Sequence, residues 1–316
     1  MAEPQGGGPL LATSRIARAC RSVLVQGLSG GPGRRSARLM REYGTEVVGG
    51  VVPGRGGQDV DGVPMYDTVA ALADANGSVP SSLVSVAPQR TEQAAVEAID
   101  AGCDVVVLRA ERIPHQAMLR VVEHARRAGT LLVGGNSLGV LVPGVGRIGN
   151  LGGEVDFARR VFTPGDVAVI SRSGGNTGTL GWYLSSAGIG QSCVISMGGD
   201  AVPGSSLLDL LLELERDPDT RAVAYYGEVG TSQEETVAAA IDAGRITKPL
   251  IAHIAGRYTT PGVRYGHAGA FIESGAGEAG SVIAKERLLR AAGVHVVEHL
   301  DEIGDVVGAA RATGGS

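Results

Sequence analysis

The chain has 316 residues and a formal charge of −5 at pH 7, from 28 Lys and Arg against 33 Asp and Glu. The length suggests two domains, because an ordinary domain has roughly 150 residues. The mild acidity argues against a nucleic-acid protein, which needs positive charge for phosphate contacts. No stretch approaches about 18 uninterrupted apolar residues, the N-terminus has no basic-then-apolar leader, and the three cysteines have neither metal-ligand nor disulfide spacing. We therefore expect a cytoplasmic protein with no membrane span and no metal site of its own.

Short apolar runs alternate with helical patterns in the first part of the chain. Runs that are apolar throughout predict strands buried on both faces of a sheet, and their alternation with helices predicts parallel βαβ units. The expected strands are Val23–Gln26, Val47–Val52, Ser82–Val86, Val105–Leu108 and Leu131–Gly134. The expected helices are Ser36–Tyr43, Thr68–Asn76, Thr91–Ala101 and Ile113–Gly129.

The stretch 134–165 is dense in Gly and Pro and is the best candidate for a linker. A second alternation follows, with expected strands at Val167–Ser171, Gln191–Ser196, Arg221–Tyr226, Leu250–Ile254 and Val294–Val297. The helices expected between and after them are Thr177–Ala187, Leu207–Arg216, Gln233–Gly244, Ser281–Ala292 and Leu300–Ala310. We therefore expect an α/β protein of two open, doubly wound domains, residues 1–135 and 136–316. Ligands of such domains bind beyond the carboxyl ends of the strands.

The first strand runs directly into a glycine-rich loop, Gly27–Gly33. Glycines allow the backbone to approach a phosphate, and the N-terminus of the following helix offers N–H groups and partial positive charge. Arg34 and Arg35 add formal positive charge. The loop is therefore a candidate phosphate site, and a tight turn with solvated arginines is the alternative.

The end of the second strand discriminates between nucleotide ligands. An NAD-binding fold carries an acidic residue there for the ribose hydroxyls. This chain has instead a basic glycine loop, Gly54-Arg55-Gly56-Gly57. A cation at that position suits a ligand with an extra phosphate, such as NADP or coenzyme A, and disfavours NAD.

The second domain opens with another anion site, Ser171–Gly178, which combines hydroxyls, bare backbone and a helix N-terminus. Its candidate phosphate-binding residues are Ser173, Gly174, Gly175, Asn176 and Thr177. The spacing GxxxxGK[ST] occurs nowhere in the chain, so a nucleoside triphosphate would be held elsewhere. At a third junction, Gly198–Ser205, Asp200 either orients a ligand or caps a turn.

His267 lies between glycines and alanines in Gly266-His267-Ala268-Gly269-Ala270, which leaves room to present its imidazole to a large group. Glu228 follows a predicted strand at the same sheet edge, where it could accept a hydrogen bond from one ring nitrogen. That bond would fix the tautomer and free the other nitrogen as a nucleophile. The alternatives are a loop histidine without a task and a Glu228 that caps the next helix together with Ser232.

Together these stretches resemble the alpha subunit of succinyl-CoA synthetase, from about Arg21 to Ala310. The stretches that carry the resemblance are Tyr43–Val51, Pro53–Gly57, Glu97–Gly102, Ser171–Gly174, Gly198–Asp200, Pro203–Ser205, Gly227–Glu228 and Gly266–Ala270. The resemblance implies a Rossmann-like CoA-binding domain followed by a flavodoxin-like ligase domain. It also implies a partner beta subunit with an ATP-grasp fold that binds ATP or GTP with Mg²⁺.

In the family, the histidine that matches His267 takes a phosphoryl group, a carboxylic acid receives it as an acyl phosphate, and the thiol of coenzyme A then forms the acyl-CoA. The resemblance implies a coenzyme site made of Gly30, Gly31, Pro32, Gly33, Arg55, Val86, Ala87, Glu111 and Asn136. In the family, two helix N-termini face the phosphohistidine, and the resemblance implies that the helix opening at Gly175 is the one from the alpha subunit.

Several loops depart from the family's pattern. Its basic loop usually has Lys where this chain has Arg55, and its Pro-Ala-Pro-Phe is Val86-Ala87-Pro88-Gln89 here. Its Gly-Pro-Asn-Cys-Pro-Gly is Gly134–Gly139, without the prolines and the cysteine. We therefore expect a paralogue with a different acid substrate. Alternatives are the same chemistry with an amine or other acceptor, a non-catalytic CoA-binding module and, more distantly, a nicotinamide-dependent reductase.

Overall fold

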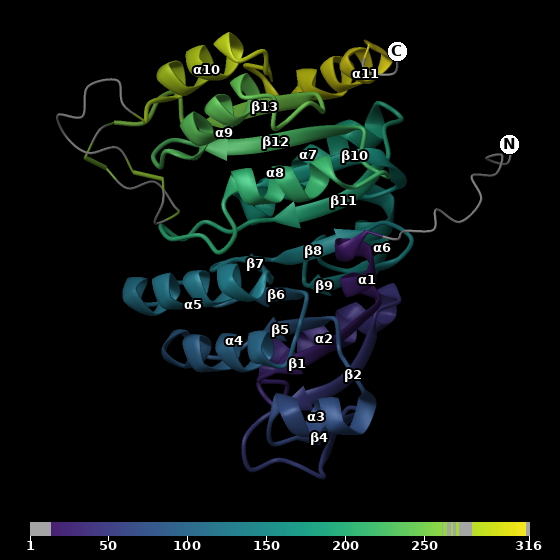
Figure 1. Ribbon diagram of the computed structural model, residues 1–316. Helices are drawn as coiled ribbons and strands as arrows, with labels where there is room; N and C mark the ends of the chain where they lie inside the picture. The colour runs from purple at the N-terminus through teal and green to yellow at the C-terminus, as the bar shows by residue number, and fades with distance from the viewer. Residues whose placement is uncertain (1–13, 261, 264–266, 268–269, 272–279, 314–316) are drawn as a thin grey trace, which may run out of the picture.

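The computed structural model describes residues 14–260, 262–263, 267, 270–271 and 280–313. Their strands form two sheets of seven, one in the lower half of Figure 1 and one in the upper half. The chain leaves the first sheet at Val133 and enters the second at Gly139.

The first sheet has the strand order β3-β4-β2-β1-β5-β6-β7 and is parallel except for β3. Without β3 this is the order of the Rossmann fold, which reverses direction between β1 and β5. The strands are β1 Ser22–Gln26, β2 Glu46–Val51, β3 Asp59–Val60, β4 Val63–Tyr66, β5 Ser81–Val84, β6 Val105–Leu108 and β7 Leu131–Val133. Helices α1 Arg15–Arg21 and α2 Gly31–Tyr43 cover one face; α3 Val69–Asn76, α4 Thr91–Asp100 and α5 His115–Ala128 cover the other.

The second sheet has the order β14-β13-β12-β10-β11-β8-β9. Its five parallel strands follow the flavodoxin-like order, with the reversal between β10 and β12. The strands are β8 Gly139–Val142, β9 Gly146–Gly149, β10 Pro164–Ser171, β11 Gln191–Ser196, β12 Ala222–Glu228, β13 Leu250–Ala255 and β14 His295–Val296. Helices α6 Val155–Val161, α7 Gly174–Ser186 and α11 Ile303–Thr313 cover one face; α8 Leu207–Glu215, α9 Gln233–Asp242 and α10 Val282–Ala291 cover the other.

The sequence suggested that the segment 134–165 is a linker, and this prediction is wrong. It forms the antiparallel pair β8–β9 on the edge of the second sheet, and then α6. The glycines mark a close backbone approach: Gly139 has φ 113°, and a Cβ there would lie 1.8 Å from the carbonyl oxygen of Ile148. Helix α1 was also not predicted. Helix α2 begins at Gly31 rather than Ser36, because proline fits the first helical turn.

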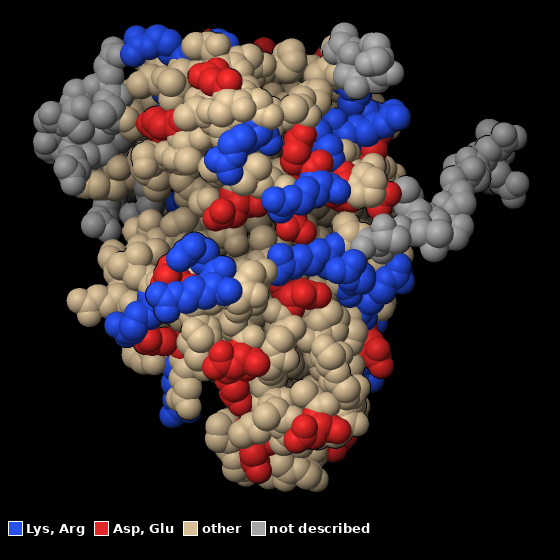
Figure 2. Space-filling model, in the orientation of Figure 1, with Lys and Arg blue, Asp and Glu red and all other residues tan. Residues whose placement is uncertain are grey.

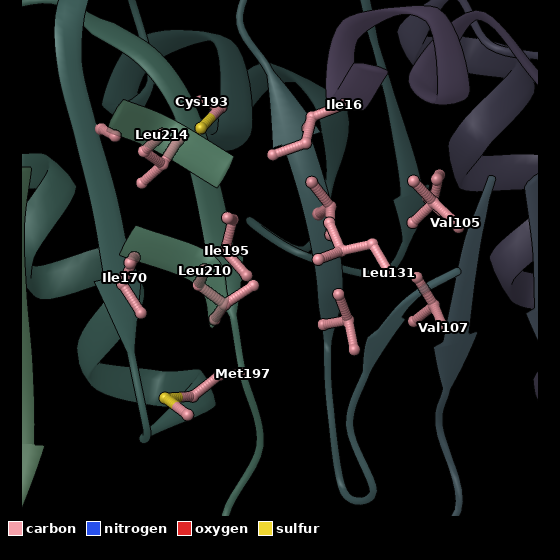
Figure 3. Packing of buried hydrophobic residues seen from close by; sticks show 14 of the residues in the cluster. Ile16, Val105, Val107, Leu131, Ile170, Cys193, Ile195, Met197, Leu210 and Leu214 are labelled. Carbon is pink, nitrogen blue, oxygen red and sulfur yellow. The ribbon is translucent and has the colours of Figure 1, made fainter. Parts of the chain in front are cut away.

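The two sheets share a continuous hydrophobic core. Figure 3 shows Ile16, Val105 and Leu131 on one side and Ile195 and Leu210 on the other, all members of one buried cluster. Because β8 and β9 form the edge of the second sheet that lies next to the first sheet, their apolar side chains join the two halves of this cluster.

A buried arginine reinforces this junction. Arg147 on β9 is fully buried, and its guanidinium donates to the carbonyl oxygens of Leu39 (2.8 Å), Leu151 (2.9 Å) and Gly153 (2.8 Å). The guanidinium also lies 5.2 Å from the centre of the Tyr43 ring. Burial lowers the pKa of Arg147 to about 10. The arginine thus ties α2 of the first half to the loop that leads to α6.

Charges of both signs are interspersed on the face drawn in Figure 2. On and beside α5, Arg120 pairs with Glu92, while Arg126 and Arg127 both pair with Glu123. None of the helices within the described ranges is both long enough and apolar enough to cross a membrane.

Candidate active site

The topology brings three loops together at the carboxyl edge of the second sheet. β10 ends at Ser171, β12 ends at Glu228, and β11 leads into the loop that holds Gly199. Since β10 and β12 flank the reversal point of the sheet, a ligand is expected beyond their ends. His267 reaches this edge from the segment between β13 and α10.

His267 and Glu228 form a hydrogen-bonded pair. Nδ1 of His267 lies 2.8 Å and 3.0 Å from the two carboxylate oxygens of Glu228. Because an ionised carboxylate only accepts, Nδ1 carries a proton, and Nε2 is the nitrogen with the lone pair when the imidazole is neutral. The bond to Glu228 raises the pKa of His267, although burial acts in the opposite direction. The expected bond is therefore present, and Ser232 makes no side-chain cap on α9.

The other residues that frame this histidine in the sequence, Gly266, Ala268 and Gly269, lie outside the described residues. The ring of His267 itself packs directly on Gly199. A Cβ at that position would lie 2.5 Å from Cγ and 2.6 Å from Cδ2 of the imidazole. Only a glycine leaves room for the ring there, and sequence reasoning did not single out this contact.

Arg172, directly after β10, is a buried cation beside the histidine. It is 2% exposed, and its Nη2 donates to the carbonyl oxygen of Asp200 at 3.4 Å. Its Nη1 is buried without a hydrogen-bond partner among the described residues. The charge of Arg172 acts to lower the pKa of His267, against the larger effect of Glu228. A buried cationic donor without a partner is costly, so this nitrogen is available for an anion.

Asp200 contacts a loop of the first half of the molecule, which is neither of the two roles that the sequence left open. Its buried carboxylate accepts a hydrogen bond from the backbone N–H of Arg112 at 3.0 Å. Burial raises the pKa of Asp200. Glu111, next to Arg112, contributes a negative charge that acts to raise the pKa of His267.

The predicted phosphate-binding loop is the N-terminus of α7. Ser173 is the N-cap, and its hydroxyl accepts from the backbone N–H of Asn176 at 3.4 Å. The Asn176 side-chain amide donates to that hydroxyl and to the Tyr226 hydroxyl, at 3.1 Å and 2.9 Å. The Thr177 hydroxyl donates to the carbonyl oxygen of Ser173 at 2.7 Å. Gly175 is exposed with open space around its Cα, so the first-turn N–H groups, which have no partner within a helix, can be approached.

At the reversal point of the first sheet, the loops after β1 and β5 pack against each other. Gly27 has φ 84°, and a Cβ there would lie 2.4 Å from the carbonyl oxygen of Ser85. Gly33 packs equally closely on the carbonyl oxygen of Gly27. The intervening Gly30, Gly31 and Pro32 begin α2 without a side-chain cap. Val86 and Ala87 continue the loop that follows β5.

The basic loop after β2 is held in place by a hydrogen bond to Asp67, and its arginine is exposed. The carboxylate of Asp67 accepts from the backbone N–H of Gly56 at 2.9 Å, which keeps the pKa of Asp67 below its usual range. The guanidinium of Arg55 makes only a 3.2 Å bond to Gln58 among the interactions of the described residues. Arg55 therefore extends toward solvent with most of its donors free.

Two residues predicted for the coenzyme site lie at the junction of the sheets instead of on the β1 and β5 loops. The backbone N–H of Asn136, with φ 56°, donates to the carbonyl oxygen of Ala110 at 2.7 Å. Glu111 is exposed and pairs with Arg112 at 3.3 Å. The structure thus groups Asn136 and Glu111 with Asp200, near the carboxyl edge of the second sheet where His267 lies. Within the described ranges, no three His, Cys, Asp or Glu residues gather as metal ligands.

A Rossmann-like half with a glycine-rich loop at a helix N-terminus, followed by a flavodoxin-like half with a carboxylate-supported histidine, is the arrangement of a CoA ligase subunit. Residues 20–112 match the CoA binding domain, and residues 164–310 match the succinyl-CoA ligase like flavodoxin domain. The chain is 42% identical to a succinate–CoA ligase [ADP-forming] alpha subunit of Archaeoglobus fulgidus, over 89% of this chain and 92% of that one. It is 39% identical to the malate–CoA ligase alpha subunit of Methylorubrum extorquens, over 90% and 94%.

A solved structure of ATP citrate lyase from Methanothrix soehngenii, in complex with citrate and coenzyme A, has a TM-score of 0.84 at 25% identity. It matches 93% of this chain, which spans half of the lyase chain. The chain therefore belongs to the succinate–CoA ligase alpha-subunit family, whose members are acid–thiol ligases.

Proposed function

We propose that the chain is the alpha subunit of a nucleoside-triphosphate-dependent carboxylate–CoA ligase that works through a phosphohistidine at His267. The observation that carries the proposal is the bond from Nδ1 to Glu228, which leaves Nε2 as the nucleophile. Nε2 forms a bond to the terminal phosphorus as the nucleoside diphosphate leaves. A carboxylate oxygen of the acid then takes the phosphoryl group and frees the histidine. The thiol of coenzyme A finally attacks the acyl carbon, and phosphate leaves.

The neighbouring residues are suited to the charge that moves in these steps. Glu228 supports the positive charge that develops on the imidazole while phosphorus is bound. The unpartnered Nη1 of Arg172 and the N-terminus of α7 at Gly175 supply positive charge and donors for the phosphoryl oxygens. Positioned charge of this kind is the principal contribution of a protein to phosphoryl transfer.

The first half of the molecule fits coenzyme A. Gly30, Gly31, Pro32 and Gly33 at the start of α2 suit the pyrophosphate, and the exposed Arg55 suits the additional phosphate. Val86 and Ala87 would flank the coenzyme. Glu111 and Asn136 would lie where the thiol end of the coenzyme approaches His267. We infer that residues 1–135 bind the coenzyme and that residues 136–316 carry the phosphohistidine.

We infer that an ATP-grasp beta subunit binds ATP or GTP with Mg²⁺, because this chain has no P-loop and its relatives are named as alpha subunits. The acid substrate is inferred to be a small carboxylic acid, since relatives are named for succinate and malate. The three free cysteines of this chain are all buried, which suits the reducing cytoplasm that we propose for the enzyme.

Phosphorylation of His267 is tested by incubating the chain and its partner subunit with γ-labelled ATP or GTP. We expect a base-stable, acid-labile label that is lost in His267→Asn. The matched control is His124→Asn, which removes an exposed imidazole that pairs with Asp100 on the surface. A label that survives in His267→Asn would refute the assignment. Calorimetry with coenzyme A tests the first half separately, and absence of binding at millimolar ligand would exclude the thiol as acceptor.

A further inference from the structure

A buried lysine lies directly behind the carboxylate that supports the histidine. Lys285 on α10 has a fully buried side chain, and so does its partner Glu234 on α9. The ammonium nitrogen lies 2.5 Å from a carboxylate oxygen of Glu234. It also donates to the backbone carbonyl oxygens of Glu228, at 3.2 Å, and of Gly230, at 2.5 Å.

Every polar group of this cluster has a partner. An ammonium group has three N–H donors, and Lys285 has three acceptors. The second carboxylate oxygen of Glu234 accepts from the Tyr225 hydroxyl at 2.8 Å. Buried ion pairs of this kind add little net stability, because removal of two charges from water offsets their attraction. The cluster is therefore better explained by the geometry that it fixes.

The cluster fixes the backbone at the end of β12. Lys285 holds the carbonyl groups on both sides of Val229, and the backbone N–H of Gly230 donates to the carbonyl oxygen of Gly280 at 3.1 Å. Helix α10 begins directly after the segment that bears His267. The helix that ends the histidine segment thus also grips the strand end from which Glu228 reaches the imidazole.

We propose that Lys285, charge-balanced by Glu234, is a positioning residue that fixes the Glu228 carboxylate against Nδ1 of His267. This proposal rests on the proposed function for its role in phosphoryl transfer, but its geometric content stands separately. Lys285 acts through the backbone of Glu228 and touches no reacting atom. Its removal is expected to loosen the Glu228–His267 bond and leave the proposed coenzyme site unchanged.

The test uses a variant that removes both buried charges, Lys285→Met with Glu234→Gln. The pKa of His267 is measured by NMR on histidine-labelled protein, with the signal assigned by its loss in His267→Asn. Among the described residues, the charged groups that shift the pKa of the imidazole are Glu228, Arg172 and Glu111, and all three remain in the variant. We expect the pKa to fall toward the ordinary imidazole value and the rate of His267 labelling to fall at least about tenfold. Affinity for coenzyme A should not change.

Lys248→Met is the matched control. Lys248 also donates to two backbone carbonyl oxygens, those of Leu214 and Asp217, but it precedes β13 and so lies at the opposite end of the same sheet. It should leave the pKa of His267 unchanged. An unchanged pKa and labelling rate in the folded Lys285 variant would overturn the proposal.

A second variant, Lys285→Met/Glu234→Leu/Tyr225→Phe, removes the whole polar cluster and is used if the first does not fold. If neither folds, the cluster supports the fold as a whole and the proposal is wrong. Absence of any label on wild-type His267 would instead refute the proposed function, while a fall in the pKa would still support the positioning role.

Discussion

Gly199→Ala places a methyl group against the imidazole of His267. The new carbon would lie 2.5 Å from Cγ and 2.6 Å from Cδ2, whereas carbon atoms in contact lie about 3.5–4.0 Å apart. The ring must therefore move by roughly 1 Å, which breaks or lengthens the 2.8 Å bond to Glu228. A displacement of that size costs about 100-fold in rate. We expect the phosphorylation rate of His267, measured by quenched single-turnover labelling with the partner subunit, to fall by about that factor.

The control for this variant is Gly308→Ala in α11. The added Cβ there meets only Ile189, at 4.0 Å, so the methyl group is accommodated and labelling should be normal. The pKa of His267 is an independent readout, because the bond to Glu228 raises it. It should fall in Gly199→Ala and remain high in Gly308→Ala. A normal rate together with a normal pKa in Gly199→Ala would refute the packing of the ring on Gly199.

Three further predictions concern pH, the junction and the thiols. The raised pKa of His267 gives stability that is complete below the unfolded-state value and lost as pH rises through the folded-state value. In urea titrations, the stability advantage of wild type over Glu228→Gln should therefore be largest below the ordinary imidazole pKa of about 6.5 and should shrink as pH rises above it. Arg147→Met removes the side-chain hydrogen bonds to three carbonyl oxygens and should cost about 3 kcal/mol in denaturant unfolding, whereas the exposed Arg127→Met should barely shift the midpoint. Burial raises the pKa of each cysteine, so a thiol reagent should modify none in the native state and all after unfolding; fast native modification would contradict this for Cys20, Cys103 and Cys193.

The strands could be predicted where a short apolar run lies between turn residues. β6 at Val105–Leu108 and β11 at Gln191–Ser196 have the predicted bounds. The same reasoning failed for the segment 134–165, because glycine is typical both of linkers and of strands that approach one another closely. It also failed for α1, whose seven residues are too few to show a clear helical period.

Some features of the site could likewise be predicted from the sequence, and others could not. The bond between Glu228 and His267 could be predicted because Glu228 ends one strand, the segment with His267 follows the neighbouring strand, and parallel strands end at one sheet edge. The residues that hold this bond in place could not be predicted, because their contacts leave no local pattern in the sequence. Lys285 is one of several polar residues on an ordinary amphipathic helix, and only the packing of α10 on α9 shows that it is buried with Glu234.

The glycine excess has a specific cause at the junction of the two sheets. A Cβ on Gly198 would lie 2.1 Å from the carbonyl oxygen of Gly135, so backbone meets backbone there and neither position has room for a side chain. Gly199, one residue later, makes room for the imidazole instead of for the other half of the molecule. A side chain at Gly198 would therefore push the two sheets apart, whereas one at Gly199 would move the histidine alone. Two adjacent glycines thus set two different distances, one between the halves of the molecule and one between His267 and Glu228.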